Sequence, residues 1–187
     1  MSTLQPLESA RLEPLDEAEM SPEQLEMIAP LRERYGFVFN VLKTMMRNMP
    51  LLNAWNPLAG HIMSASSLTP RQRELMILRV GWRRHCEYEW GQHVLMSQAA
   101  GLTTADHDRV REGAGAEGWS AEERALISAT DELLEHTMLS DAAWSELTAH
   151  FSEEQIMDAI FTVGQYNMLA MALNSLGVQR EDGVPGF

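Results

Sequence analysis

Four side chains with complementary chemistry occur within one short stretch of the sequence. Cys86, Glu89 and His93 are spaced i, i+3 and i+7, and Glu74 precedes them. At about 100° per residue, the first three positions fall on one narrow face of a helix. If the segment that carries Glu74 packs against this helix as an antiparallel hairpin, its carboxylate faces the same wall. The spacing therefore predicts one pocket lined by a thiol, an imidazole and two carboxylates.

Each of these side chains has a task in a proton-transfer site. Histidine ordinarily titrates near neutrality, so His93 is the natural proton carrier, and Glu89 can orient its ring or share its proton. Glu74, if it is buried, needs a partner. Cys86 near a helix N-terminus would have its thiolate favoured by the helix dipole. Tyr88, in the same stretch, can donate a hydrogen bond to a developing oxyanion.

Structural roles compete with these functional ones. A single cysteine is often a small buried hydrophobe, so a structural role is the favoured interpretation of Cys86. Glu74 can simply complement the first turn of its helix, and Tyr88 can be a pocket or core aromatic. Five arginines also gather in this stretch, and a carboxylate substrate would need such a cation. For most of them, solvation or pairing with the many acidic residues is the favoured interpretation. These arginines are Arg71, Arg73, Arg79, Arg83 and Arg84.

Helix-start and helix-stop signals recur along the chain. Capping boxes begin at Ser21, Thr69, Ser120 and Ser152. Gly101 and Gly177 stand where glycine ends a helix in a left-handed turn. No hairpin-turn signal separates alternating apolar runs, so the sequence predicts an all-α fold. The expected helices are 22–34, 50–65, 70–84, 86–100, 104–112, 121–137, 141–150 and 153–176, with Gly164 as a candidate break in the last.

Composition narrows the class of protein. The chain has 187 residues, 14 basic and 27 acidic, with a net charge of −13. This acidity disfavours nucleic acid and anionic membrane surfaces as partners. Cys86 is the only cysteine, and His61, His107, His136 and His150 show no ligand spacing, so we expect no metal and no cofactor. We see no secretory signal and no spanning apolar run, and we expect a cytoplasmic protein.

The stretch 73–101 resembles the signature of the carboxymuconolactone decarboxylase/AhpD-like superfamily. AhpD-type peroxidases carry a Glu, a Cys-x-x-Cys motif twelve positions later, and a His four residues after the second Cys. Glu74, Cys86 and His93 match these positions, and Tyr88 matches the tyrosine inside the motif. The resemblance extends in style over about residues 35–178.

One position departs from the peroxidase pattern. Glu89 stands where the second cysteine would be, which removes the redox-active disulfide of the AhpD mechanism. The segment from Glu89 to His93 instead fits the Glu-x-x-x-His pattern of the decarboxylase branch. The resemblance implies an AhpD-like helical bundle whose central hairpin, 70–84 with 86–100, carries the site. It also implies a homo-oligomer, such as a trimer, hexamer or dimer.

The expected organisation is an N-terminal arm, 1–20, followed by a single helical domain, 21–187, with the signature core at about 50–137. The arm either packs on a neighbour or is loose. The leading function is a decarboxylase-like lyase that performs acid–base chemistry on a small carboxylated or lactone metabolite. The alternative is a one-cysteine thiol peroxidase that uses Cys86. A non-catalytic binding or assembly module is the third hypothesis.

Overall fold

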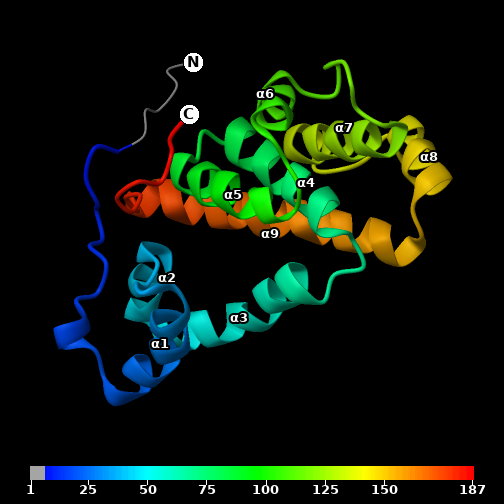
Figure 1. Cartoon of the computed structure of the whole chain (residues 1–187). Helices are drawn as coiled ribbons and strands as arrows, with labels where there is room; N and C mark the ends of the chain where they lie inside the picture. Colours follow the sequence, from blue (N-terminus) through cyan, green and yellow to red (C-terminus); the bar gives the residue numbers. More distant parts are fainter. Residues whose placement is uncertain (1–6) are drawn as a thin grey trace.

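Helices make up every regular element in residues 7–187, the part of the chain that the computed structural model describes (Figure 1). The prediction of an all-α fold is therefore confirmed. In chain order the elements are η1 (Glu17–Glu19), α1 (Pro22–Tyr35), α2 (Asn40–Met45), η2 (Met46–Asn48), α3 (Met49–Ser64), α4 (Pro70–Arg83), α5 (Glu87–Ala99), α6 (Thr104–Glu112), α7 (Ala121–His136), α8 (Asp141–His150) and α9 (Glu153–Leu176).

Local sequence signals place most of these helices. Ser21, Thr69, Ser120 and Ser152 each form both reciprocal bonds of a capping box, which begins α1, α4, α7 and α9. Each such cap stabilises its helix by about 1 kcal/mol, because it satisfies backbone N–H groups that have no partner inside the helix. Gly177 ends α9 with φ of 69°, the left-handed conformation expected there.

Two expectations about the helices are wrong. The sequence showed no helix at 40–45, whereas α2 lies there and leads into η2. The N-cap residue of α2 makes no side-chain cap bond. Its first backbone N–H groups are instead satisfied by Glu181 and Tyr88, which are distant in sequence. The candidate break at Gly164 does not occur, and α9 continues through this residue.

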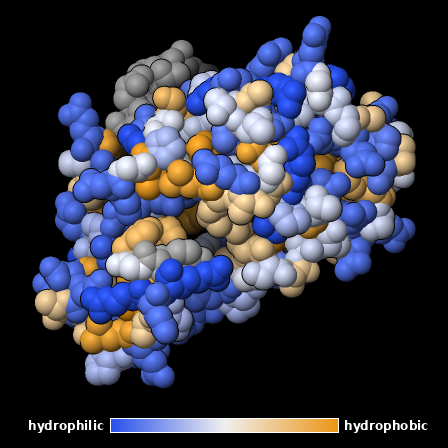
Figure 2. Space-filling model, viewed as in Figure 1, coloured by the Kyte–Doolittle hydropathy of each residue, from blue (hydrophilic) through white to orange (hydrophobic). Residues whose placement is uncertain are grey.

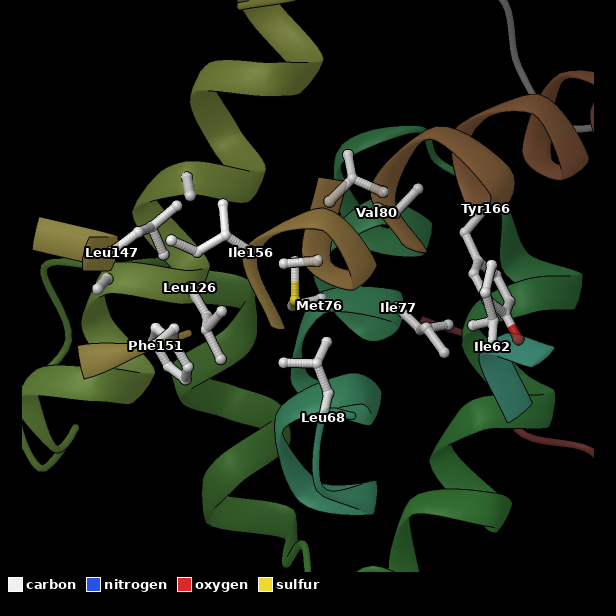
Figure 3. Packing of buried hydrophobic residues seen from close by; sticks show 14 of the residues in the cluster. Ile62, Leu68, Met76, Ile77, Val80, Leu126, Leu147, Phe151, Ile156 and Tyr166 are labelled. Carbon is white, nitrogen blue, oxygen red and sulfur yellow. The ribbon is translucent and has the colours of Figure 1, made fainter. Parts of the chain in front are cut away.

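The helix α4 lies at the centre of the fold and packs against α5, α6, α7 and α9. Its buried residues point in all directions around the helix axis, as expected for a helix inside a core. The pair α4 and α5 forms the predicted central hairpin. The main apolar cluster joins α4 to α3, α7, α8 and α9 (Figure 3). The hairpin that carries the candidate site is thereby held from several sides.

The long helix α9 has both a core face and an exposed apolar face. By length and composition alone it is long and apolar enough to cross a membrane, although the sequence showed no spanning run, and half of its most apolar window is buried inside the protein. Its contacts with α4 and α7 are those of a core helix. Met157, Phe161, Met168 and Met171 are exposed on it. The homo-oligomer remains a prediction, and these residues offer apolar surface for it.

The described part of the N-terminal arm packs on its own chain. The backbone N–H groups of Arg11 and Leu12 donate to the carbonyl of Leu176 at the end of α9, and the N–H of Leu15 donates to the carbonyl of Lys43. The arm therefore joins the end of α9 to the α1–α3 segment. Residues 1–6 of the predicted arm lie outside the described residues.

Candidate active site

A cavity of about 300 Å³ lies between the α1–α3 segment and the helices α5 and α9. Its size is at the small end of the range for ligand sites. Figure 2 shows a hollow between these two parts of the molecule, with apolar residues around it. Most of the cavity wall is apolar or aromatic. The polar side chains that line it are Tyr88, Glu89, Gln92, His93, Gln165 and Tyr166.

His93 is held by a carboxylate from the neighbouring helix. Its Nδ1 lies 2.7 Å from Oε2 of Glu74 on α4, and both side chains are almost fully buried. The ring of Tyr166 meets the imidazole edge to face, with the centroids 5.0 Å apart. Because Nδ1 is occupied, Nε2 is the ring nitrogen left for a substrate. Glu74, and not Glu89, therefore orients the imidazole.

Glu74 does not itself line the cavity, since it lies behind His93. Its other oxygen is 3.6 Å from Nε of Arg73, so the carboxylate lies between a guanidinium and the imidazole. A carboxylate in this position fixes the orientation of the His93 ring. Glu74 thus contacts the site through His93 without direct exposure to the cavity, and its catalytic role stays a prediction.

Glu89 is a buried carboxyl group with no hydrogen-bond partner among the described residues. Its side chain lines the cavity, and the residue is only 2% exposed. Burial raises the pKa of Glu89 well above its ordinary value, because the charged form loses its hydration and gains no partner. A carboxyl group that keeps its proton at neutral pH can donate a hydrogen bond or a proton to a ligand.

The pH dependence of stability tests this state of Glu89. A raised pKa in the folded protein means that the stability it supports is fully present below the unfolded pKa, near 4.5, and is lost as pH rises. Relative to Glu89→Gln, the wild-type free energy of unfolding should therefore fall above pH 5, by up to about 1.4 kcal/mol per pH unit. Urea titrations from pH 5 to pH 8 measure this difference. Parallel curves for the two proteins would mean that Glu89 is ionised in the folded state.

Tyr88 is bound from the C-terminal tail, which the sequence did not connect with the site. Its hydroxyl donates to Oε1 of Glu181 at 2.9 Å and accepts from the N–H of Val41 at 3.2 Å. Gln92 donates to the other oxygen of Glu181. The phenolic proton is thus already committed, so the expected role as an oxyanion donor gives way to a structural one. Tyr88 and Glu181 together join α5 to the start of α2.

The C-terminal tail passes close to α5, and this path positions Glu181. A Cβ atom on Gly91 would lie 2.1 Å from the carbonyl oxygen of Pro185, so only glycine fits at position 91. Further along, the ring of Phe187 packs against Trp82 and Trp90. Glu181 was not among the predicted site residues, because a single acidic residue in a tail carries no local signal of such a contact.

Cys86 does not line the cavity, contrary to prediction. It is fully buried in an apolar cluster with Tyr88, Ala170, Leu173 and Val178. Burial raises the pKa of the Cys86 thiol far above its ordinary value, and this outweighs any help from its position at the N-cap of α5. The expected thiolate is therefore disfavoured in this structure.

Alkylation tests the state of the thiol directly. In the native protein, Cys86 should react with iodoacetamide at pH 8 on the order of a hundredfold or more slowly than in the denatured protein, because the thiol is buried and protonated. Mass spectrometry of timed samples measures both rates, and guanidinium chloride supplies the denatured control. Similar rates in the two states would show that the thiol is accessible and reactive.

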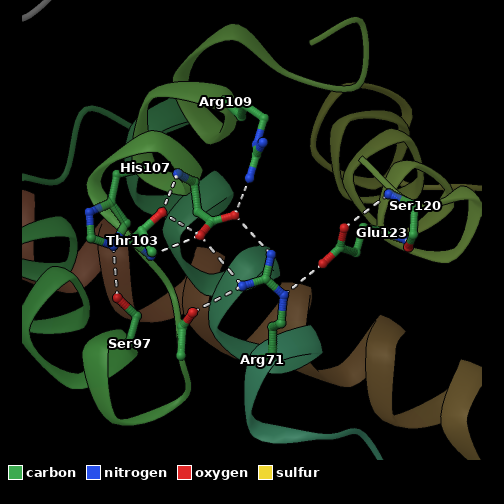
Figure 4. Close-up of polar contacts among 9 residues, drawn as sticks. Arg71, Ser97, Thr103, His107, Arg109, Ser120 and Glu123 are labelled. Carbon is green, nitrogen blue, oxygen red and sulfur yellow. Dashed lines mark hydrogen bonds and ion pairs between the residues drawn. The ribbon is translucent and has the colours of Figure 1, made fainter. Parts of the chain in front are cut away.

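The arginines of the 71–84 stretch form ion pairs and hydrogen bonds away from the cavity. Arg71 lies between Asp106 and Glu123 and ties α4 to α6 and α7 (Figure 4). Arg84 donates to Asn167 and to the carbonyl of Leu134. Arg79 and Arg83 both bind Asp131. Pairing with acidic residues is therefore the right interpretation for Arg71, Arg79 and Arg83, whereas Arg84 binds an amide and a backbone carbonyl, and none of the four lines the cavity. Within residues 7–187, no three His, Cys, Asp or Glu side chains gather as a metal site would require.

Comparison with known proteins agrees with this architecture. Residues 50–132 match the model of the carboxymuconolactone decarboxylase family. An uncharacterized peroxidase-related protein from Silicibacter sp. TM1040 is similar in structure, with a TM-score of 0.82 and 19% identity over 98% of this chain and 97% of that one. An AhpD-core peroxidase-related protein from Ralstonia eutropha JMP134 has a TM-score of 0.81 and 18% identity over 91% and 93% of the two chains.

The debrominase Bmp8 is also similar in fold, with a TM-score of 0.77 and 16% identity over 91% of this chain and 92% of that one. A search of curated proteins finds no match. The fold is thus the all-helical AhpD-like fold. The segment 50–132 thus matches the carboxymuconolactone decarboxylase family, which its sequence signature indicated, and the chain as a whole has the fold of AhpD-like proteins.

Proposed function

We propose that the protein is an enzyme that transfers protons on a small carbonyl or lactone compound bound in the cavity. The observation that carries the proposal is the buried Glu74–His93 pair, which leaves Nε2 of an oriented imidazole at a ligand-sized cavity. Such a pair is a standard arrangement for a general base, since the carboxylate stabilises the imidazolium that forms.

The lining residues support a simple sequence of proton movements. Nε2 of His93 removes a proton from the carbon next to the carbonyl group, and the electron pair moves onto the carbonyl oxygen. The protonated carboxyl of Glu89 donates a hydrogen bond to that oxygen. The imidazolium then returns its proton to carbon. Return of the proton at another carbon gives an isomer. If a leaving group on the neighbouring carbon departs with the electron pair instead, a double bond forms and the imidazolium donates its proton to the departing group, which gives a lyase reaction.

The second candidate is a one-cysteine thiol peroxidase. It is favoured by the position of Cys86 directly behind the cavity wall, since Tyr88 and Leu173 contact both. It also fits the names of similar proteins: two are described as peroxidase-related, and a cysteine-to-alanine variant of Bmp8 was solved with 2,3,4-tribromopyrrole. In this reaction the thiol would reduce a peroxide to an alcohol and become a sulfenic acid, which two external thiols would reduce back, releasing water and a disulfide. The burial of Cys86 counts against it.

Two assays separate these candidates. The first follows solvent exchange and turnover by proton NMR in D₂O, with a panel of small lactones and of β-keto and vinylogous acids. The second follows peroxide consumption with an added dithiol, for the wild type and Cys86→Ser. We expect exchange or turnover with at least one panel member and no peroxide consumption that depends on Cys86. Cys86-dependent peroxide consumption without any activity on the panel would replace the first proposal by the second.

A further inference from the structure

Among the described residues that line the cavity, His93 is the only side chain that can carry a positive charge, and its Nδ1 is already paired with Glu74. No Lys or Arg is among its lining residues. Arg73 is the guanidinium beside the site, and it is paired with Glu74. Glu89 contributes a second carboxyl group to the wall itself. An anion in this apolar cavity would lose its hydration, and the one positive charge it could meet, on a protonated His93, is already balanced by Glu74, so its binding is unfavourable.

Three polar groups of the cavity wall have no hydrogen-bond partner in the described part of the chain. They are the carboxyl of Glu89 on α5, the amide oxygen of Gln165 on α9 and the indole N–H of Trp55 on α3. Glu89 and Gln165 are at least 96% buried, at 2% and 4% exposure. Buried polar groups are nearly always bonded, and an unbonded one destabilises the fold. Three such groups around one cavity indicate a ligand that supplies the missing partners.

The three groups need different hydrogen-bond partners on that ligand. The amide oxygen of Gln165 accepts a hydrogen bond, whereas the indole of Trp55 donates one. Glu89, which burial keeps protonated, donates as well. The rest of the wall includes the rings of Trp55 and Tyr166 and several aliphatic side chains. The complementary molecule therefore has an apolar ring, one hydrogen-bond donor and at least one acceptor.

We propose that the cavity binds an uncharged ring compound that carries a hydroxyl or ring N–H donor beside a carbonyl or lactone oxygen as acceptor, such as a hydroxylactone. The donor group binds Gln165, and the acceptor binds Glu89 or Trp55. This inference rests on the proposed function and names the substrate class of that site. It excludes the carboxylated metabolites that the sequence left open.

Binding of three matched probes tests the inference. The probes are 2-naphthol, which is neutral with a donor, 2-methoxynaphthalene, which is neutral without one, and the anion 2-naphthoate. Titration calorimetry at pH 7 should show 2-naphthol bound about tenfold or more tightly than either of the others, one hydrogen bond or one unpaired charge being enough for such a difference. Tighter or equal binding of 2-naphthoate would overturn the inference, and so would the absence of 2-naphthol binding at millimolar concentration.

A variant pair assigns the donor contact. Gln165→Leu should weaken the binding of 2-naphthol by about tenfold and leave the affinity for 2-methoxynaphthalene unchanged, because only 2-naphthol loses a hydrogen bond. Gln98→Leu is the control, since Gln98 is exposed and lies outside the cavity. Unchanged 2-naphthol affinity in Gln165→Leu would contradict the assignment.

The binding result is separate from the test of proton transfer. Preferential binding of 2-naphthol together with no activity on any neutral compound would contradict the proposed function and support the proposed ligand class. Activity on β-keto or vinylogous acids together with a preference for 2-naphthoate would support proton transfer and contradict the proposed ligand class.

Discussion

Replacing His93 with alanine is expected to lower the rate of solvent exchange or turnover by about 10²–10⁴-fold, the usual loss when a positioned acid or base is removed. The reason is geometric. His93 is the lining residue whose imidazole is oriented by a buried carboxylate, at 2.7 Å from Glu74, and its Nε2 remains available. The loss should appear in kcat and in kcat/KM alike, since proton transfer occurs in the transition state.

Two further variants turn this loss into a test of the arrangement. Glu74→Gln keeps a hydrogen-bonding side chain at the imidazole and removes its charge, so its activity should lie between those of the wild type and His93→Ala. Cys86→Ser should change the rate by little, because the thiol is buried behind the wall. If Cys86→Ser abolishes turnover while His93→Ala only reduces it slightly, the thiol mechanism is the correct one.

Replacing Arg79 with methionine is expected to destabilise the protein by about 3–5 kcal/mol, the usual cost of breaking a buried ion pair from one side. Arg79 is 6% exposed and binds both oxygens of Asp131, at 2.8 and 2.7 Å. It also donates to the carbonyls of Val110 and Arg111 at the end of α6. The variant leaves these carbonyls without their donor and removes the link between α4, α6 and α7.

Arg83→Met provides a matched control on the same helix. Arg83 binds the same partner, Asp131, at 2.9 Å, but its side chain is 32% exposed. A partly exposed pair of this kind contributes about 1 kcal/mol or less. Guanidinium chloride titrations of both variants measure the difference in the free energy of unfolding. Equal losses of stability in Arg79→Met and Arg83→Met would show that burial does not increase the contribution of the ion pair to the free energy of unfolding.

The all-helical fold and the central hairpin could be predicted from sequence because their signals are local. A capping box such as the one at Thr69 uses a bond between residues three positions apart, and Gly177 ends its helix through its own φ angle. The common face of Glu89 and His93 follows from helix periodicity in the same way, and both residues line the cavity.

The partners of these residues were decided by tertiary structure alone. Glu181 lies 93 residues from Tyr88 and 141 from Asn40, yet its carboxylate binds both and holds α2 against α5. The tertiary structure alone also decided which residues line the cavity beside His93, since Gln165 comes from α9 and Trp55 from α3.

Burial also overturned the expectation that Cys86 forms a thiolate. At the N-cap of a helix, Cys86 has a position that favours a thiolate, but the packing of Ala170 and Val178 around it removes water, and desolvation dominates. Local sequence thus determined which side chains share a helix face. Only the packing of distant segments decided which of them contact the cavity, which are paired and which keep their protons, because hydration and long-range contacts are properties of the whole fold.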